Sequence, residues 1–278
     1  MSSKPVEIMW IFKRLKAKPR KKMGQNFFIA EKYIDLMVDS AGVGRSDLII
    51  EIGPGTGKIT EKLLGKGVKI IAIEKDGNLS TYLKKKFCQN KQIEILEADF
   101  LKTDIEKLSK NNPYKIVSNI PHNITGKIFR KILELKNKPN TAVFSLQKEK
   151  AEKIARKNKG EKENLLSLIF QTFGQIEFVA KIPASAFWPQ PKTDSAIIKA
   201  IFSKKPKIKN HKDFIKFIKA GFSSPRKKAI TNLSKGLNIK KDILLKIFGK
   251  LGFNINSRPE DLNFNDWKNI FQSISSDK

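Results

Sequence analysis

The fold of this chain is constrained most strongly by an alternation of short apolar runs with helix-compatible stretches across its first half. Five runs have the length and composition of buried strands: 48–53, 69–74, 93–99, 115–120 and 141–147. Between them lie stretches such as ITEKLLGKG and GNLSTYLKKKF, which suit helices. Strands that alternate with helices form a parallel sheet with helices on both faces. We therefore predict an α/β domain.

Two further apolar runs extend the predicted sheet to seven strands. They cover 176–182 and 195–202, with no convincing helix between them. Without a crossover helix the chain cannot return to start a second parallel strand, so an antiparallel addition at the sheet edge is expected. The predicted sheet is therefore mostly parallel, with an antiparallel edge.

The composition changes after the last run. Residues 203–212, SKKPKIKNHK, are polar and basic and are interpreted as a linker, and the remainder shows apolar residues at three- and four-residue intervals. That spacing is typical of helices, and we place them at DFIKFIKAGF, PRKKAITNLSKGL, KKDILLKIFGKLG and FNDWKNIFQSI. The expected domains are the α/β domain at 23–205 and a small all-helical domain at 206–278. Residues 1–22 would be a basic arm that lies on RNA phosphates, or a frayed tail.

Net charge narrows the class of partner. Lys and Arg number 56 and Asp and Glu 27, which gives a net charge of +29 and a pI near 10.0. Such an excess attracts polyanions and favours nucleic acid, although a lysine-rich proteome would produce the same composition. The single cysteine excludes an internal disulfide and a cysteine-rich metal site,, and no metal is expected. No apolar stretch reaches the length of about 18 residues that a membrane span needs. We expect a cytoplasmic monomer.

A glycine-rich turn follows the first predicted strand. EIGPGTG places Gly53, Gly55 and Gly57 where the chain must turn and approach a ligand closely,. A phosphate-binding loop is excluded because no Gly-Lys-Ser/Thr follows. The dinucleotide fingerprint also fails, because Lys58 stands where its third glycine is needed.

Two carboxylates follow at the tips of the next two strands. Glu74 comes about 20 positions after Gly53, the spacing of an acidic residue that binds ribose hydroxyls,. Asp99 at the third tip would accept a hydrogen bond from an adenine amine. Helix N-capping is the structural alternative for both. Ribose and adenine contacts without a pyrophosphate signature indicate S-adenosylmethionine as the cofactor.

The fourth strand opens into SNIPHNIT, a polar turn made rigid by Pro121,. The Asn119 side-chain oxygen and a carbonyl near Ile120 would accept the N6–H groups of an adenine and aim its lone pair at the methyl donor. His122 would stack on the extruded base. Phe187, in a proline-stiffened loop, would cover the other face of the base, or be an ordinary core residue.

At this point the sequence resembles the ribosomal RNA adenine N6-dimethyltransferases, from about residue 21 to 271. The motifs that carry the resemblance are KKMGQNFF, EIGPGTG, NIP, SLQKEKAEKI, FWPQPKTDSA, FSSPRKKAITNL and RPEDLNFNDW. It implies a Rossmann-like class I methyltransferase domain with a helical RNA-binding domain. It also implies that Asn26 and Phe28 line the donor site together with Gly53, Gly55, Glu74, Asp99 and Asn119.

Within that family, PKTDSA and PRKKAITNL are more similar to the housekeeping branch, which dimethylates two adjacent adenosines of small-subunit (16S) rRNA during ribosome maturation. The partner implied is immature small-subunit RNA, with Arg226, Lys227 and Lys228 as phosphate contacts or as solvated helix surface. The alternatives are the erythromycin-resistance branch, which modifies large-subunit (23S) rRNA, and a catalytically weakened rRNA-binding biogenesis factor. A methyltransferase for DNA or protein is a more distant alternative.

His122 departs from the family pattern, which has Tyr or Phe at this position. Imidazole offers less stacking area and titrates near neutral pH. We expect activity to fall below about pH 6.5 and His122→Tyr to retain or raise it.

Overall fold

The computed structural model describes residues 5–155 and 162–276. The chain forms two compact units: Met1–Ala151 with Glu177–Phe202, and Glu152–Ile176 with Ser203–Lys278. The first four residues of the expected N-terminal arm and the last two of the expected helical domain lie outside the described residues.

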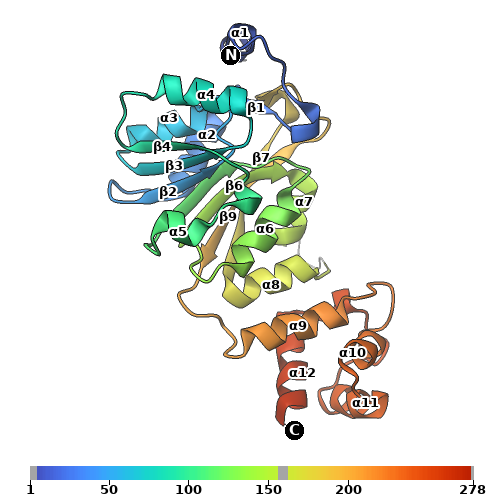
Figure 1. The fold of residues 1–278 in the computed structure, drawn as a ribbon. Helices are drawn as coiled ribbons and strands as arrows, with labels where there is room; N and C mark the ends of the chain where they lie inside the picture. The colour runs from blue at the N-terminus through green and yellow to red at the C-terminus, as the bar shows by residue number, and fades with distance from the viewer. Residues whose placement is uncertain (1–4, 156–161, 277–278) are drawn as a thin grey trace. The chain divides into compact units, whose positions relative to one another are not determined.

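The first unit contains a seven-stranded sheet in the order β4-β3-β2-β5-β6-β9-β7 (Figure 1). Its strands are β2 (Leu48–Ile52), β3 (Lys69–Glu74), β4 (Ile93–Glu97), β5 (Lys115–Asn119), β6 (Thr141–Gln147), β7 (Gly174–Ile182) and β9 (Ser195–Phe202). The pairs within β4-β3-β2-β5-β6 are parallel, and β9 is antiparallel to β6. The predicted α/β sheet, mostly parallel with an antiparallel addition, is confirmed.

The strand order fixes where the helices lie. The chain moves outward in one direction from β2 to β4 and then returns to β5 on the other side of β2. Because parallel crossovers are right-handed, this reversal places the connecting helices on opposite faces. The helices of this part are α2 (Glu31–Ser40), α3 (Lys58–Gly65), α4 (Gly77–Lys86), α5 (Ile105–Ser109), α6 (Thr125–Glu134) and α7 (Lys148–Ala155). Figure 1 shows helices on both faces of the sheet.

A second, two-stranded sheet was not predicted. β1 (Phe27–Phe28) pairs antiparallel with β8 (Phe187–Trp188), with Phe28 opposite Phe187. Two residues are too few to produce a detectable alternation of apolar and polar side chains. The pairing matters for function because it brings the N-terminal motif against the loop that carries Phe187.

Residues 6–14, which the sequence analysis left as part of an arm or tail, form helix α1 (Val6–Arg14). Ile8, Ile11 and Phe12 recur at helical spacing and are buried. Ile8 and Phe12 share a hydrophobic cluster with Phe27 and Leu79. This burial explains the helix, because so short a helix is marginal without tertiary packing.

The second unit is built mainly from helices. They are α8 (Leu165–Phe173), α9 (His211–Gly221), α10 (Ala229–Leu237), α11 (Lys241–Lys250) and α12 (Phe264–Ser276), with a 3-10 turn at Pro259–Asp261. Aromatic rings fill its core: Phe217 lies 5.6 Å from Trp267, centroid to centroid. None of the helices in the described part of the chain is both long and apolar enough to cross a bilayer.

Two features of this unit differ from the expectation. Ser203 and Lys207, in the expected linker, donate backbone hydrogen bonds to Phe173 and Thr172 of α8, at 2.7 and 2.9 Å. Ser203 and Lys207 are therefore tied to α8, residues 211–212 already belong to α9, and α8 groups with the helical unit. Helix α10 begins at Ala229 rather than near Pro225, because Lys228 is extended with ψ 141°.

Candidate active site

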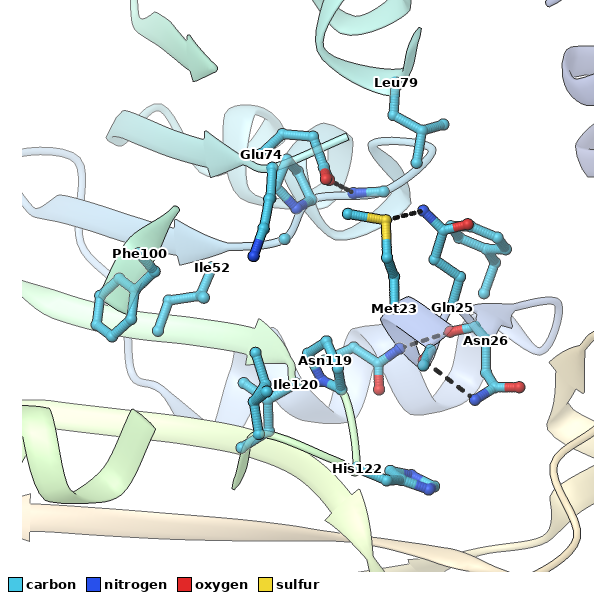
Figure 2. Close-up of a pocket in the computed structure, with 18 of the residues that line it drawn as sticks. Met23, Gln25, Asn26, Ile52, Glu74, Leu79, Phe100, Asn119, Ile120 and His122 are labelled. Carbon is cyan, nitrogen blue, oxygen red and sulfur yellow. Dashed lines mark hydrogen bonds between the residues drawn. The ribbon is translucent and has the colours of Figure 1, made fainter. Parts of the chain in front are cut away.

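A pocket opens at the carboxyl ends of β2, β3, β4 and β5, where the strand order reverses (Figure 2). This is the place where open α/β sheets bind ligands. Its walls include all ten residues that the sequence analysis assigned to the cofactor and to catalysis: Asn26, Phe28, Gly53, Gly55, Glu74, Asp99, Asn119, Pro121, His122 and Phe187. The structure therefore brings these residues into one cavity.

The glycine-rich turn is held by Glu74. The Glu74 carboxylate accepts hydrogen bonds from the backbone N–H groups of Gly55 and Asp76, at 3.0 and 2.8 Å. Burial raises its pKa. The helix cap that was the alternative role of Glu74 belongs instead to Asp76, which accepts from the backbone of Asn78 at the start of α4. Glu74 thus joins the ends of β2 and β3.

Asp99 caps a turn, which is the structural alternative, and it also lines the pocket; its contact with an adenine amine stays a prediction. Its side chain accepts from the Leu101 backbone N–H, which caps the 3-10 turn at Phe100–Lys102. Lys75 donates to its other oxygen at 2.8 Å. This hydrogen bond, more than any other influence, lowers the pKa of Asp99. The group is therefore a carboxylate at neutral pH.

A further carboxylate lies beneath the turn. Glu51 is fully buried and accepts one hydrogen bond from the Thr60 hydroxyl at 2.6 Å. Its other oxygen has no hydrogen-bond partner among the residues that the structure describes. Burial raises the pKa of Glu51 to about 8. The side chain is therefore mostly protonated at neutral pH and adds little charge to the region.

Residues 22–26 cross from the β3 side of the pocket to the turn after β5. Gln25 donates to Asp76 at 3.0 Å on the β3 side. On the side of the turn after β5, a Cβ placed on Gly24 would lie 3.1 Å from the Pro121 side chain, so these two segments are in close contact. Asn123 also donates to the carbonyl of Lys22 at 3.0 Å. This segment, which we call the strap, forms one wall of the pocket.

The strap orients Asn119. The Asn119 side-chain nitrogen donates to the backbone carbonyl of Asn26 at 2.9 Å. Figure 2 shows the amide oxygen turned away from Asn26, with no hydrogen bond drawn to it. The following residue, Ile120, is fixed by a hydrogen bond from its N–H to the Ser145 carbonyl at 3.1 Å. The turn thus presents a fixed acceptor oxygen to the cavity.

His122 is half-buried at the edge of the cavity. Its Nε2 lies 3.4 Å from the Ser195 hydroxyl, and its carbonyl accepts from the Lys150 ammonium at 2.7 Å. Burial, followed by the positive charge of Lys150, lowers the pKa of His122. The imidazole therefore keeps its neutral form to a lower pH than a free histidine does. The expected fall in activity below about pH 6.5 stays a prediction, with its onset moved to a more acidic solution.

Phe187 is a core residue as well as a pocket residue. Only 3% of it is exposed, and its ring lies 4.5 Å from that of Phe28, centroid to centroid. Both rings belong to the main hydrophobic cluster of the sheet. The core role that the sequence analysis held as an alternative is therefore present.

Sequence reasoning missed several groups that complete the site. Gln25 lines the pocket and donates to Asp76, Asp76 donates its backbone N–H to Glu74, and the Ser195 hydroxyl lies 3.4 Å from His122 Nε2. Gln25 lies within the GQNFF motif, which is the signal that could have found it. Among the described residues no cluster of His, Cys, Asp and Glu could hold a metal.

The expected RNA contacts lie in the other unit. Arg226, Lys227 and Lys228 are exposed and precede α10. Lys228 differs from the other two because its ammonium donates to Asn256 at 2.5 Å.

Comparison with known proteins places the chain in a family. The family model described as ribosomal RNA adenine dimethylase matches residues 16–276. A protein named ribosomal RNA small subunit methyltransferase A, from Dehalococcoides mccartyi, is 36% identical over 91% of this chain and 87% of its own length. A protein of the same name from Mycoplasma capricolum is 35% identical over 92% of this chain and 98% of its own.

Among solved structures, that of the 23S rRNA methyltransferase ErmE has a TM-score of 0.75, with 22% identity over 90% of this chain and 99% of its own. At that identity the similarity concerns the fold alone. The sequence-based resemblance is confirmed by the family model and the relatives: the chain is an rRNA-modifying enzyme that belongs to the ribosomal RNA adenine dimethylase family.

Proposed function

We propose that this enzyme transfers methyl groups from S-adenosylmethionine to the N6 atoms of two adjacent adenosines in small-subunit rRNA. One observation carries the chemistry: Asn26 holds the Asn119 amide so that its oxygen, not its nitrogen, is left to the cavity. An acceptor in that position can bind an N6–H group, which a donor could not.

The residues at the carboxyl ends of β2, β3 and β4 fit the methyl donor, and we call them the donor side. A Cβ added to Gly53 would meet nothing within 4 Å, so the turn leaves open space at that residue. Glu74 has remaining lone pairs for ribose hydroxyls, and ionised Asp99 can accept from an adenine amine. Asn26 on the strap and Phe28 on β1 would close the methionine end. When bound, S-adenosylmethionine supplies a methyl group that is electrophilic because it is attached to a sulfonium.

Residues 119–122 and Phe187 form the acceptor side. An adenine N6 lone pair is delocalised into the ring, which makes the amine a poor nucleophile. Asn119 Oδ1 and the Ile120 carbonyl would each accept one N6–H and turn the lone pair toward the methyl group. Positioning of this kind needs no strong base. His122 and Phe187 would flank the extruded base.

The choice of small-subunit rRNA rests on the relatives. The proteins from D. mccartyi and M. capricolum are named for the small subunit and cover nearly the whole chain. Exposed Arg226 and Lys227, together with Lys228, would contact phosphates and so position the RNA without reading its sequence.

Methyl transfer from labelled donor tests the proposal. The purified protein would be incubated with small subunits, and separately with large-subunit RNA, each from cells that lack the modification. We expect two adjacent N6,N6-dimethyladenosines in small-subunit RNA, mapped by mass spectrometry. Transfer only to large-subunit RNA, or tight binding of small subunits without transfer, would contradict the proposal.

A further inference from the structure

Helix α1 exposes a stripe of apolar side chains. Among the described residues five large hydrophobic side chains are exposed, and three of them, Val6, Met9 and Trp10, lie on this helix of nine residues. Their exposed fractions are 62%, 51% and 55%. Residues three and four positions apart lie on one face of a helix. The three side chains therefore form one continuous surface, which we call the α1 stripe.

The opposite face of α1 fixes the helix in place. Ile8 and Ile11 are 1% and 2% exposed, and Glu7 accepts a hydrogen bond from Lys58, at the start of α3, at 2.7 Å. The exposed stripe is thus not the consequence of a detached helix. It is a fixed surface that costs little further entropy when a ligand binds to it.

Basic side chains continue the α1 stripe. The Arg14 guanidinium carbon lies 4.5 Å from the Trp10 ring centroid, a cation–π contact. Lys13, Lys16 and Lys18 are exposed nearby. The one acidic residue of α1, Glu7, is already paired with Lys58. An aromatic ring that is more than half exposed therefore stands in a strongly positive surface.

We propose that the α1 stripe is a docking surface for single-stranded RNA, in which a base stacks on Trp10 and phosphates contact Lys13 and Arg14. Stacking of bases on aromatic rings combined with positive charge is the usual basis of single-strand binding. Arg14 lies over part of the indole, and the exposed remainder is open to a second planar group. The inference rests on the proposed function in that it takes RNA as the substrate.

Charge and apolar area favour RNA over other occupants. A second copy of this chain, with a net charge of +29, would place like charges against each other, which opposes association. An interfacial membrane helix needs a large apolar face, but the more apolar face of α1 is buried in the protein. A polyanion with planar bases can pair its phosphates with the basic side chains and stack a base on the exposed Trp10 ring.

The place of α1 suggests what the docking would achieve. Trp10 does not line the pocket, so the stripe would hold nucleotides other than the one that is methylated. On its buried side α1 packs against Phe27 and Leu79, which do line the pocket. The stripe thus fixes RNA to the outer wall of the donor side.

Three substitutions of Trp10 in the full-length protein separate stacking from charge. The probe is a fluorescently labelled 12-nucleotide oligoadenylate, and heparin serves as a polyanion without bases. Because stacking on an aromatic is worth about 1–3 kcal/mol per base, Trp10→Ala and Trp10→Leu should weaken oligoadenylate binding by roughly fivefold or more. Trp10→Phe should recover most of the loss, and heparin binding should not change.

Arg14→Ala gives a contrasting signature. Loss of one phosphate contact should reduce the slope of log K against log salt by about one, which Trp10→Leu should not do. If Trp10→Leu binds oligoadenylate as the wild type does, or loses heparin binding equally, the stacking proposal is wrong.

Two further measurements decide between occupants. Trp10-dependent binding to phosphatidylglycerol vesicles, or a Trp10-dependent dimer in sedimentation, would overturn the proposal if oligoadenylate binding were unaffected by Trp10→Leu. The wild-type methylation assay tests the function separately. If the protein binds oligoadenylate in a Trp10-dependent manner but methylates no rRNA, the docking surface is supported and the proposed function is rejected. If it methylates small-subunit rRNA but binds oligoadenylate independently of Trp10, the function is supported and the docking surface is rejected.

Discussion

The donor side and the acceptor side of the pocket differ in how far their polar groups already have partners. On the donor side Glu74 accepts two backbone N–H groups and Asp99 accepts from Leu101 and Lys75. On the acceptor side Asn119 uses its nitrogen, and no hydrogen bond to its oxygen is present among the described residues. Buried polar groups normally find partners. The difference indicates that hydrogen bonds to its own carboxylates fix the backbone of the donor side, whereas the acceptor side has an oxygen left to accept a hydrogen bond from a ligand.

The largest effect is expected on the acceptor side. Removing one preorganised polar group from an active site typically costs about 10²–10³ in turnover, and we expect a loss of that order for Asn119→Ala. Donor affinity should fall less than turnover, because the bonds of Glu74 and Asp99 remain. Single-turnover methyl transfer and calorimetric titration with S-adenosylmethionine measure the two quantities.

Asn119→Asp is the matched variant for this test. It keeps an acceptor oxygen but loses the N–H that donates to the Asn26 carbonyl. We expect activity between those of the wild type and Asn119→Ala. An Asn119→Ala enzyme with undiminished turnover would show that the acceptor side does not work as proposed.

The next largest effect belongs to the donor side. Glu74→Gln leaves one acceptor oxygen for two N–H donors, Gly55 and Asp76, so one of these loses its partner. An unsatisfied buried group costs about 1–3 kcal/mol, which should appear in the free energy of unfolding and as a weaker affinity for S-adenosylmethionine.

Glu97→Gln is its control, because Glu97 is an exposed carboxylate at the end of the neighbouring strand β4. It should leave both quantities nearly unchanged. Equal affinity for S-adenosylmethionine in the wild type and Glu74→Gln would show that Glu74 does not contribute to donor binding.

The two sides also differ in how much of them the sequence predicted. The carboxyl ends of parallel strands share one edge, so the positions of Gly53, Glu74 and Asp99 followed from strand order alone. The predicted bounds of the main-sheet strands were close to the observed ones because buried apolar runs such as KIIAIE end at polar residues. The strap and the β1–β8 pair could not be found, because they depend on contacts such as Phe28 with Phe187 between segments far apart in the chain.

Helix α1 was missed for a different physical reason. Its apolar residues lie on two faces, and only the fold decides that Ile8, Ile11 and Phe12 are buried while Met9 and Trp10 are exposed. The basic residues that follow correctly predicted a positively charged segment, but they gave no indication of a helix. The outcome for Phe187 is similar, because a phenylalanine between prolines suits a core and a pocket equally.

Two glycines of the turn offer a smaller test, within the donor side. Gly53 and Gly55 have φ angles of 65° and 62°, so alanine at either position should cost about 1–2 kcal/mol of backbone strain. A Cβ on Gly55 would also lie 2.9 Å from the Phe27 ring, whereas one on Gly53 would enter open space.

Gly55→Ala should therefore lower the melting temperature more than Gly53→Ala does. Gly53→Ala should weaken donor binding more than Gly55→Ala does, because its methyl group would enter the open space. Thermal denaturation and calorimetry distinguish them. The reverse order would mean that the open space at Gly53 is not where the donor binds.

The smallest effect is expected at His122. Its pKa is lowered from the ordinary value of about 6.5 by burial and by Lys150, so protonation, which would place a second cation near the sulfonium, requires a more acidic solution. The turnover of the wild type relative to His122→Tyr should be constant from pH 8 to 6.5 and should decline only below that range. At neutral pH His122→Tyr, with a larger ring for stacking, should change turnover by no more than severalfold. His122→Phe, which lacks the hydroxyl, separates ring size from hydrogen bonding to Ser195. A ratio that already changes between pH 8 and 7 would mean that the imidazole is ionised in the working enzyme, and that the acceptor side tolerates a charge that its burial should exclude.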